Sequence, residues 1–548
     1  MRTLILAALA ALSTAAAAVP PIMPPGPPPA PPPRLLVVIS VDQLSGELFD
    51  AYRPHFTGGL ARLARGTMFR NGYQAHSATE TCPGHSTILT GALPSRSGIV
   101  ANNWIDQSVG RSDKTVYCSE DERIAGSSSS SYTVSPFHLL SPTLGDRLKA
   151  RAPQSRNVAV AGKDRSAVMM GGRAVDQRWY WDGKTFATDR KGAVSPTVTA
   201  FNAALAQRLA VASPPLDLPP LCQGKARPYT LAEGFTVGAG RLERAASDVR
   251  AFRASPDFDA AVLALGAGLV QEMRLGRGPA TTDILSLGLA ATDVVGHSFG
   301  NGGAEMCLQM LGLDRELGSF LDLLDSTGVD YAVTLTADHG AMDIPERLRD
   351  RGIAQATRAD PALAPEQIGK RLATDLKLSG PVLLGEGIGG DVWLDRALQG
   401  RDRTRALTAA VAAYRAHPQV AAVFTGAELA RLSIPTGDVA RWDLRQRARA
   451  TYFPGRSGDF MVFLKEYVSP IAKPGRGYAA GHGTPWDYDR RLPIVFWRKG
   501  MAASERTDSA STTDIAPTLS AMIGLPADAS PSDGRCLDRI AGILCPTR

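Results

Sequence analysis

The sequence lacks several patterns that define common functional classes. Its six cysteines include no Cys-x-x-Cys pair, so a zinc site built from cysteines is not expected. It has no run of lysines and arginines with interleaved aromatic residues, although its net charge is +7, so nucleic acid is not an expected partner. Beyond residue 20, no segment is long and apolar enough to cross a bilayer.

The first 33 residues divide into two segments with different compositions. Residues 1–18 carry a positive charge at Arg2, then a Leu/Ala-rich stretch and three alanines, which is the pattern of a secretory signal peptide. The alternative, a membrane anchor, requires a longer apolar run. Residues 19–33 are dominated by proline and predict an extended spacer. We therefore expect a periplasmic or secreted protein, in which disulfides can form.

Apolar, β-branched runs alternate with amphipathic stretches along the rest of the chain. Residues 35–41 form a continuous run that is typical of a strand buried on both faces of a parallel sheet. Further strands are expected at 157–161, 284–289, 331–336 and 492–497. Helices are expected at 56–64, at 306–324, from Thr81 and from Asp514. The alternation predicts an α/β fold, with a doubly wound, mostly parallel sheet flanked by helices.

One large domain, residues 34–548, is expected to contain two segments that break this alternation. They lie near 100–155 and 341–475 and are interpreted as cap or insertion elements. Both contain many aspartates, so an additional calcium ion bound there remains an open alternative.

Six side chains that could bind metal stand at expected strand ends or helix starts. They are Asp42, Asp293, His297, Asp338, His339 and His482. In doubly wound sheets ligands bind beyond the carboxyl ends of the strands, so these side chains are expected to converge. Taken singly, each also suits a turn cap or a surface pair. Together, three carboxylates and three imidazoles are about what two zinc ions need, and such a pair can clamp both oxygens of a phosphoryl transfer.

Thr81 is the candidate nucleophile. It opens the segment Thr81-Cys82-Pro83-Gly84-His85, where it is expected to be the N-cap of a helix. A zinc ion and the helix N-terminus would both favour its alkoxide, whereas the alternative is a plain capping role. His85 is interpreted as support for this helix. Rival hydroxyls nearby are Thr79, Ser86 and Thr87, and the histidines interpreted as structural are His55, His76, His138 and His417.

Two of the six cysteines are close in sequence. Cys536 and Cys545 lie near the C-terminus and are the expected disulfide. Cys82 adjoins the candidate nucleophile and Cys307 lies in an apolar helical stretch, so either is interpreted as a buried free thiol.

The motifs follow one another along the chain as Asp42, residues 81–85, Asp293 and His297, Asp338-His339, and residues 481–483. This order resembles that of the alkaline phosphatase superfamily, in the branch shared with nucleotide pyrophosphatase/phosphodiesterases. Residues 513–519 near the C-terminus also resemble that superfamily. The resemblance implies two zinc ions, and a phosphothreonine intermediate at Thr81 that water then hydrolyses. One ion would be held by Asp293, His297 and His482, and the other by Asp42, Asp338 and His339 together with the Thr81 oxygen.

Two further segments are similar to those of the threonine-nucleophile alkaline phosphatases. In residues 98–104, Asn102 would donate to a phosphoryl oxygen, and in residues 162–166, Lys163 and Arg165 would contact the nonbridging oxygens. A monoester dianion carries more charge on those oxygens than a diester, so these cations should favour monoesters. Without the resemblance, residues 163–165 would be an ordinary charged loop. The sulfatase pattern is absent, because Pro83 directly follows Cys82.

The implied function is an exported zinc-dependent alkaline phosphatase that acts on small-molecule phosphate monoesters. Two alternatives remain open. One is a phosphodiesterase or nucleotide pyrophosphatase, and the other is a non-catalytic exported binding protein with the same fold. The oligomeric state and the physiological ester are left open by the sequence.

Overall fold

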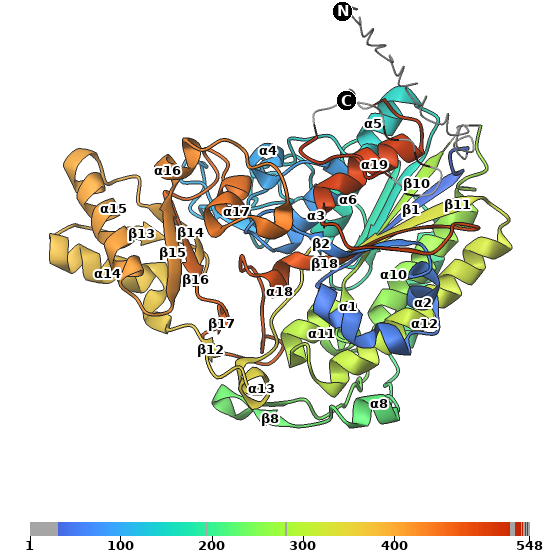
Figure 1. Cartoon of the computed structure of the whole chain (residues 1–548), viewed down its shortest axis with the longest axis horizontal. Coiled ribbons are helices and arrows are strands. Elements are labelled where there is room, and N and C mark those ends of the chain that lie inside the picture. The colour runs from blue at the N-terminus through green and yellow to red at the C-terminus, as the bar shows by residue number, and fades with distance from the viewer. Residues whose placement is uncertain are drawn as a thin grey trace, which may run out of the picture.

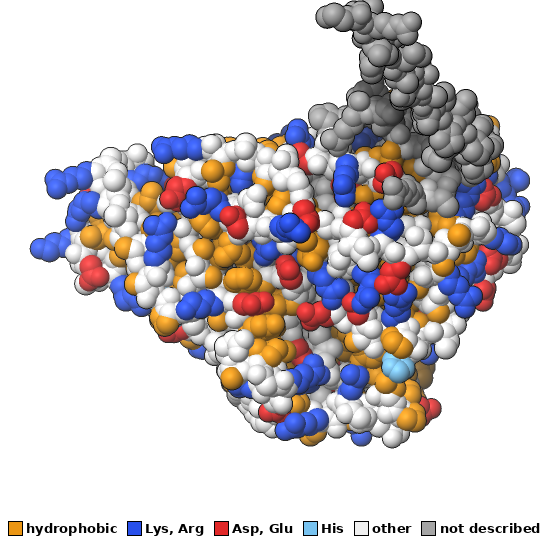
Figure 2. All heavy atoms as spheres, in the orientation of Figure 1, with side chains coloured by type: hydrophobic (Ala, Val, Ile, Leu, Met, Phe, Trp, Pro, Cys, Tyr) orange, Lys and Arg blue, Asp and Glu red, His pale blue; other side chains and the backbone are white. Residues whose placement is uncertain are grey.

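The computed structural model describes residues 31–548, except 193, 280–281, 527–531, 539, 541–542, 544 and 546–548. The expected signal peptide and the spacer up to residue 30 lie outside this range. Among the described residues, no helix combines the length and apolar character that a membrane crossing requires. On the face in Figure 2, basic and acidic side chains are interspersed over most of the surface.

A mixed ten-stranded sheet forms the centre of the molecule (Figure 1), in the order β19-β2-β18-β11-β1-β10-β5-β6-β7, with β20 beside β2. Its central strands β11, β1, β10 and β5 run parallel, whereas β18 is antiparallel to both of its neighbours. These five strands are β1 (Leu35–Val41), β5 (Asn157–Ala161), β10 (Asp283–Leu289), β11 (Tyr331–Thr336) and β18 (Arg491–Arg498). The other five are β2 (Thr67–Tyr73), β6 (Gln177–Trp181), β7 (Phe186–Ala187), β19 (Ser504–Arg506) and β20 (Ala510–Ser511). The predicted α/β class and its mostly parallel sheet are confirmed, and the strand bounds agree within one residue.

Alternate residues of β1 pack on opposite layers of helices, as the twofold period of a strand requires. Leu35, Val37 and Ile39 face one layer, and Leu36 and Val38 face the other. The first layer contains α10 (Pro256–Glu272), α11 (Ala291–Phe299) and α12 (Ala304–Ser326), and the second contains α3 (Thr81–Thr90), α5 (Leu144–Arg151) and α19 (Ile515–Met522). The core strand is therefore buried on both faces, which explains its continuous apolar sequence.

The first predicted helix is shorter than expected. The sequence predicts a helix at 56–64, but α2 covers only Gly59–Leu63. The buried carboxylate of Asp314 accepts hydrogen bonds from the backbone N–H groups of Thr57 and Gly58, both at 2.7 Å. Because these donors are held by a side chain of α12, the chain before Gly59 does not join the helix.

A second, four-stranded sheet with its own apolar core lies to the left of the central sheet in Figure 1. Its strands, in spatial order, are β13 (Leu383–Leu384), β14 (Gly390–Leu394), β16 (Phe460–Leu464) and β15 (Val420–Thr425), and α14 (Pro365–Leu376) and α15 (Gly400–Arg415) pack on it. Residues 100–155 instead contribute a small hairpin, β3 (Asn103–Ile105) and β4 (Thr115–Tyr117), and the core helix α5.

All six cysteines form disulfides. The pairs are Cys82–Cys118, Cys222–Cys307 and Cys536–Cys545. The predicted C-terminal pair is confirmed, but the interpretation of Cys82 and Cys307 as free thiols is wrong. Their partners are distant in sequence and are brought close only by tertiary packing, of the β3–β4 hairpin beside α3 and of α8 (Pro220–Gln223) on α12.

Candidate active site

The predicted ligands and cations stand in spatial order along one edge of the central sheet. The strands β11, β1, β10 and β5 are neighbours in that order in the sheet. They are followed in the chain by Asp338, Asp42, Asp293 and Lys163, respectively. These strands are parallel, so their carboxyl ends meet at one edge. The four side chains are all buried. Residues that are far apart in the sequence thus enclose one small polar volume.

A first group of potential ligands surrounds the Asp293 carboxylate. Its Oδ1 lies 3.3 Å from His297 Nε2 and 3.5 Å from His482 Nε2. Asp293 and His297 lie one turn apart on α11, whereas His482 comes from the segment before β18. Although burial opposes ionisation, the Lys163 ammonium holds the pKa of Asp293 well below its usual value. The carboxylate is therefore charged, as a metal ligand must be.

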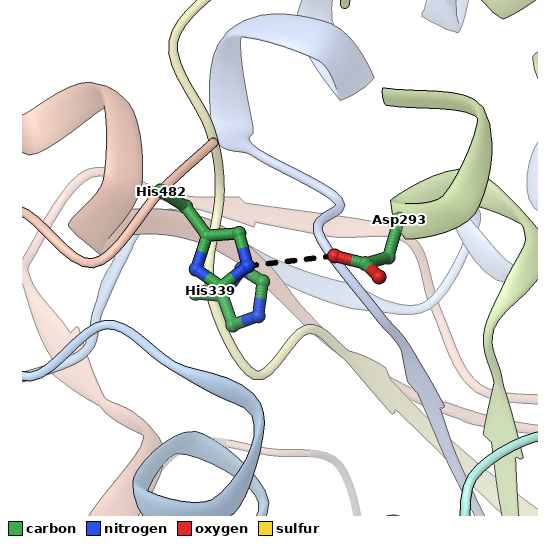
Figure 3. A group of neighbouring side chains, drawn as sticks. All are labelled: Asp293, His339 and His482. Atoms are coloured by element: carbon green, nitrogen blue, oxygen red, sulfur yellow. Dashed lines mark ion pairs between the residues drawn. The ribbon is translucent and has the colours of Figure 1, made fainter. Parts of the chain in front are cut away.

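A second group surrounds His339. Its Nε2 lies 3.4 Å from Asp42 Oδ1 and 3.3 Å from Asp338 Oδ2. The His339 ring also stacks on His482, with ring centroids 3.7 Å apart, so the two groups are in contact. Figure 3 shows this junction, where ligand atoms of Asp293, His339 and His482 lie within 4.8 Å of one another. The six predicted ligand side chains therefore lie together, but among the described residues the two groups of ligand atoms within 4.8 Å of one another differ from the predicted triads. They are Asp293, His339 and His482, and Asp42, His85 and Asp338.

The ligand histidines are held in one tautomer by backbone carbonyls. In each of the three, Nδ1 lies 2.8–3.0 Å from a carbonyl oxygen, so Nδ1 carries the proton and donates it. The acceptors are Ala480 O for His297, Gly340 O for His339 and Thr79 O for His482. Nε2 keeps its lone pair and faces the carboxylates, which is the arrangement a metal-ligating imidazole requires.

Unpartnered buried atoms at this centre fit bound metal ions. Among the described residues, Asp42 Oδ1, Asp293 Oδ1, Asp338 Oδ2 and His339 Nε2 are buried and accept no hydrogen bond. Burial raises the pKa of Asp42 well above its usual value, and the neighbouring Asp293 and Asp338 carboxylates raise it further. Three buried carboxylates with one lysine lack compensating charge, and cations would supply it. Carboxylate and imidazole donors together suit zinc.

The Thr81 hydroxyl lies beside two of the predicted cations. Its Oγ1 is 3.4 Å from Lys163 Nζ and 3.3 Å from Arg165 Nη2. Lys163 Nζ also lies 2.7 Å from Asp42 Oδ2 and 2.6 Å from Asp293 Oδ2. The predicted N-cap role of Thr81 is wrong: α3 begins at Thr81, and Glu80 occupies the cap position. The hydroxyl is therefore not needed to cap the helix and is available for chemistry.

Asn102 is anchored to the residues on either side of Thr81. Its side-chain Oδ1 accepts from the backbone N–H of Cys82 at 2.8 Å, and its own N–H donates to Glu80 Oε2 at 2.7 Å. Since Oδ1 is already used as an acceptor, the amide NH₂ group remains as a donor at the start of α3. The structure thus brings Lys163 and Arg165 to the Thr81 hydroxyl, and Asn102 to the backbone of the next residue.

Sequence reasoning missed several residues that shape this site. The hydroxyls of Tyr117 and Tyr132 donate to Asp164 at 2.8 and 3.0 Å, and Tyr117 Oη lies 3.5 Å from Arg165 Nη1. His85 Nδ1 lies 3.0 Å from Asp338 Oδ2, so His85 contacts the ligand centre itself. No local pattern marks the two tyrosines. Only the Cys82–Cys118 pairing would have placed the β3–β4 hairpin, which ends at Tyr117, beside α3.

A buried carboxylate, Asp259, holds the start of the ligand helix α11. It accepts from the backbone N–H of Ala291 and from Gln309 Nε2, both at 2.9 Å. Burial nevertheless raises its pKa from 3.8 to about 7. From about pH 4 to 7 the folded chain therefore retains a proton that the unfolded chain has lost, and this group's contribution to stability falls as pH rises, by up to about 1.4 kcal/mol per unit.

We expect Asp259→Asn to reduce this fall. Chemical denaturation of both proteins at pH 5 and pH 8, in excess chelator so that metal binding does not contribute, measures the difference. The free energy of unfolding should decrease less for the variant than for the wild type between these two values. A decrease of the same size in both proteins would show that Asp259 does not titrate in this range.

Comparisons with known proteins identify the family of the chain. Residues 36–486 match the family described as Type I phosphodiesterase / nucleotide pyrophosphatase, and the chain belongs to that family. It is 50% identical over 512 residues to alkaline phosphatase PhoK of Sphingomonas sp, covering 93% of this chain and 91% of PhoK. It is 44% identical over 508 residues to alkaline phosphatase PhoD of Zymomonas mobilis subsp. mobilis, covering 92% and 88%.

Among solved structures, that of alkaline phosphatase PafA superposes with a TM-score of 0.80 at 24% sequence identity, covering 93% of this chain and 99% of PafA. Murine ectonucleotide pyrophosphatase / phosphodiesterase 5 gives a TM-score of 0.52 at 13% identity, covering 91% and 97%. Both likenesses show a shared fold.

Proposed function

We propose that this chain is an exported, zinc-dependent alkaline phosphatase that hydrolyses small-molecule phosphate monoesters through a phosphothreonine at Thr81. The observation that carries the proposal is the buried Thr81 hydroxyl, within 3.4 Å of Lys163 and Arg165, beside two groups of carboxylates and imidazoles. The names of the relatives PhoK and PhoD support the monoester activity. The signal-like residues 1–18 support export to the periplasm or the medium.

One zinc ion would be held by Asp293, His297 and His482, and the other by Asp42, Asp338, His339 and the Thr81 oxygen. When bound, the ions supply positive charge to the attacking and leaving oxygens. The residues of the chain supply the rest of the mechanism, which consists of two successive displacements at phosphorus. In each displacement one P–O bond forms and another breaks.

Thr81 Oγ1 gives its proton to water and attacks phosphorus in line with the departing oxygen. The bond from Oγ1 to phosphorus forms, the bond to the leaving oxygen breaks, and the released alkoxide takes a proton from water. Lys163 and Arg165, with the amide of Asn102, bind the nonbridging oxygens and neutralise their charge. A water oxygen then attacks the phosphothreonine from the side that the alcohol has left, which releases inorganic phosphate and restores the threonine.

The family also includes phosphodiesterases, so a phosphodiesterase or nucleotide pyrophosphatase is the rival activity. Lys163 and Arg165 favour the monoester, because a dianion gains more from two cations than a monoanion does. We expect a higher kcat/KM for p-nitrophenyl phosphate than for bis-p-nitrophenyl phosphate, measured by nitrophenolate release under identical conditions. A preference for the diester would replace the proposed activity with its rival.

Metal removal tests the cofactor directly. We expect chelation to abolish turnover, zinc to restore it, and elemental analysis of the purified protein to give about two zinc ions per chain. The same analysis reports any additional calcium. Asp293→Asn is the matched variant, because it removes one ligand carboxylate while nearly keeping its size. It should lower the zinc content toward one ion. Full activity in chelator from a zinc-free chain would favour a metal-independent protein, and a zinc-free chain without activity would favour the non-catalytic binding protein.

A further inference from the structure

In-line attack by Thr81 directs the leaving group to one side of the site. The departing oxygen must lie opposite Thr81 Oγ1, and therefore beside Asp293, His297 and His482, which would hold the ion that receives it. This inference rests on the proposed function. Two elements adjoin that side: α9 (Val249–Arg253), which packs against α11, and a turn formed by residues 475–478.

The turn presents an aromatic ring beside the ligand His297. Gly475 and Tyr478 exchange backbone hydrogen bonds of 2.9 and 3.2 Å, and Gly477 has a φ of 80°, a conformation that favours glycine. The Tyr478 ring stacks on His297 with centroids 5.1 Å apart and an angle of 22°. The residue is nevertheless 50% exposed, although large apolar side chains are usually covered. One part of the ring contacts the site and the rest is free to contact a ligand.

Arg253 of α9 has no acidic partner in the described part of the chain. Its Nε is buried and donates to nothing there, and its guanidinium lies 5.9 Å from the centre of the Phe258 ring. Phe258 packs against Gly162, where an added Cβ would come within 2.9 Å of the ring, and Gly162 directly precedes Lys163. The Phe258 ring therefore lies between Arg253 and the loop that carries the proposed phosphoryl-binding residues Lys163 and Arg165.

Two charged side chains of the site influence the Arg253 guanidinium. Burial and the adjacent Arg165 lower the pKa of its guanidinium, and Asp293 opposes that shift. A half-buried cation beside another arginine, without its own carboxylate, is destabilising unless an anion from outside the chain completes it. One helical turn earlier on α9, Arg250 is exposed, and its Cδ lies 3.9 Å from the Cβ position of Gly477.

We propose that α9 and the 475–478 turn form a leaving-group subsite that binds a second anionic group of the substrate. Arg253 receives this anion, and Arg250 and Tyr478 border it. The favoured substrates carry a terminal phosphoryl group on a leaving group that bears another phosphate or a carboxylate. They include the monoesters of bisphosphates and the phosphoanhydrides of nucleoside diphosphates. In this proposal the substrate-binding site holds two anionic groups: the transferred phosphoryl group and the second anion of the leaving group.

The test compares substrates with and without the second anion. Arg253→Met removes the charge but keeps an apolar stem over Phe258. We expect it to lower kcat/KM for ADP by about tenfold or more, mainly through KM, as loss of a charge-assisted hydrogen bond predicts. For p-nitrophenyl phosphate, whose leaving group gains no such contact, the change should stay below about twofold. Arg253→Lys should recover part of the loss on ADP.

Inhibition gives a second readout that does not depend on turnover of ADP. With p-nitrophenyl phosphate as substrate, Arg253→Met should weaken inhibition by methylenebisphosphonate much more than inhibition by inorganic phosphate. Arg401→Ala on α15, at the far end of the molecule (Figure 1), removes the same charge from a distant exposed site and should change neither inhibitor.

Equal changes for both substrates and both inhibitors, or no change for either, would overturn the subsite. Failure of the proposed function would give a different result from failure of the subsite. In that case the wild-type protein would hydrolyse neither p-nitrophenyl phosphate nor ADP through Thr81. If Arg253→Met folds poorly by circular dichroism, Arg253→Lys against the wild type supplies the same comparison with the packing preserved.

Discussion

Replacement of Thr81 by alanine is expected to lower kcat for p-nitrophenyl phosphate by about 10⁴-fold or more, because no phosphothreonine can form. Folding should be unaffected. Thr81 is the first residue of α3 rather than its cap, and alanine is a favourable residue within a helix. Initial rates measure the loss, and circular dichroism and zinc content show that the protein is folded and loaded.

Two matched variants make this result specific to the hydroxyl. Thr81→Ser keeps an attacking oxygen and should retain a substantial part of the activity. Ser86→Ala removes a rival hydroxyl of the same helix, whose Oγ donates to the Pro83 carbonyl at 2.8 Å, and should leave turnover nearly unchanged. If Thr81→Ala turned over at a rate similar to the wild type, Thr81 would not be the nucleophile. A severe loss in Ser86→Ala together with that result would transfer the role to Ser86.

Replacement of Lys163 by alanine is expected to have the second largest effect and to change substrate preference. Its Nζ lies 3.4 Å from the nucleophilic oxygen, in a buried site where a charged donor is worth more than in water. We expect kcat/KM for p-nitrophenyl phosphate to fall by about 10²–10³-fold, and that for bis-p-nitrophenyl phosphate by about tenfold. The monoester to diester ratio of the two rates is therefore the decisive measurement.

Zinc analysis must accompany this experiment, because Lys163 also contacts Asp42 and Asp293. Its removal takes away the ammonium group that repels other cations from these carboxylates, which should keep or strengthen their hold on metal ions. Lys184→Ala, an exposed lysine outside the site, is the control for loss of one positive charge. A variant that loses the same factor on both esters while keeping its zinc would show that Lys163 does not select monoesters.

Much of the site was accessible from the sequence because its ligands follow strands with strong local signals. The run at residues 35–41 marks a strand buried on both faces, and the carboxylate that follows it, Asp42, lies at the edge where parallel strands end. The same reasoning located Asp293 and Asp338. Lys163 and Arg165 depended instead on resemblance to a family, since a charged loop has no periodic pattern that marks it.

What could not be predicted depends on contacts between segments far apart in the chain. The Cys82–Cys118 and Cys222–Cys307 pairs have no spacing rule. Tyr117 and Tyr132, which donate to Asp164, lie on two separate segments whose positions are set by packing. Arg253 is unusual only because it has no acidic partner in the part of the chain that the structure describes, which a sequence cannot show. The helix start at Gly59 likewise depends on a carboxylate some 250 residues away, since Gly58 bonds to Asp314.

The proposed ligands extend from Asp42, directly after the first strand of the central sheet, to His482 in the segment before β18. No fragment that ends before His482 contains the complete set. In the proposed mechanism, turnover therefore requires a chain that is synthesised through His482 and folded around all six side chains.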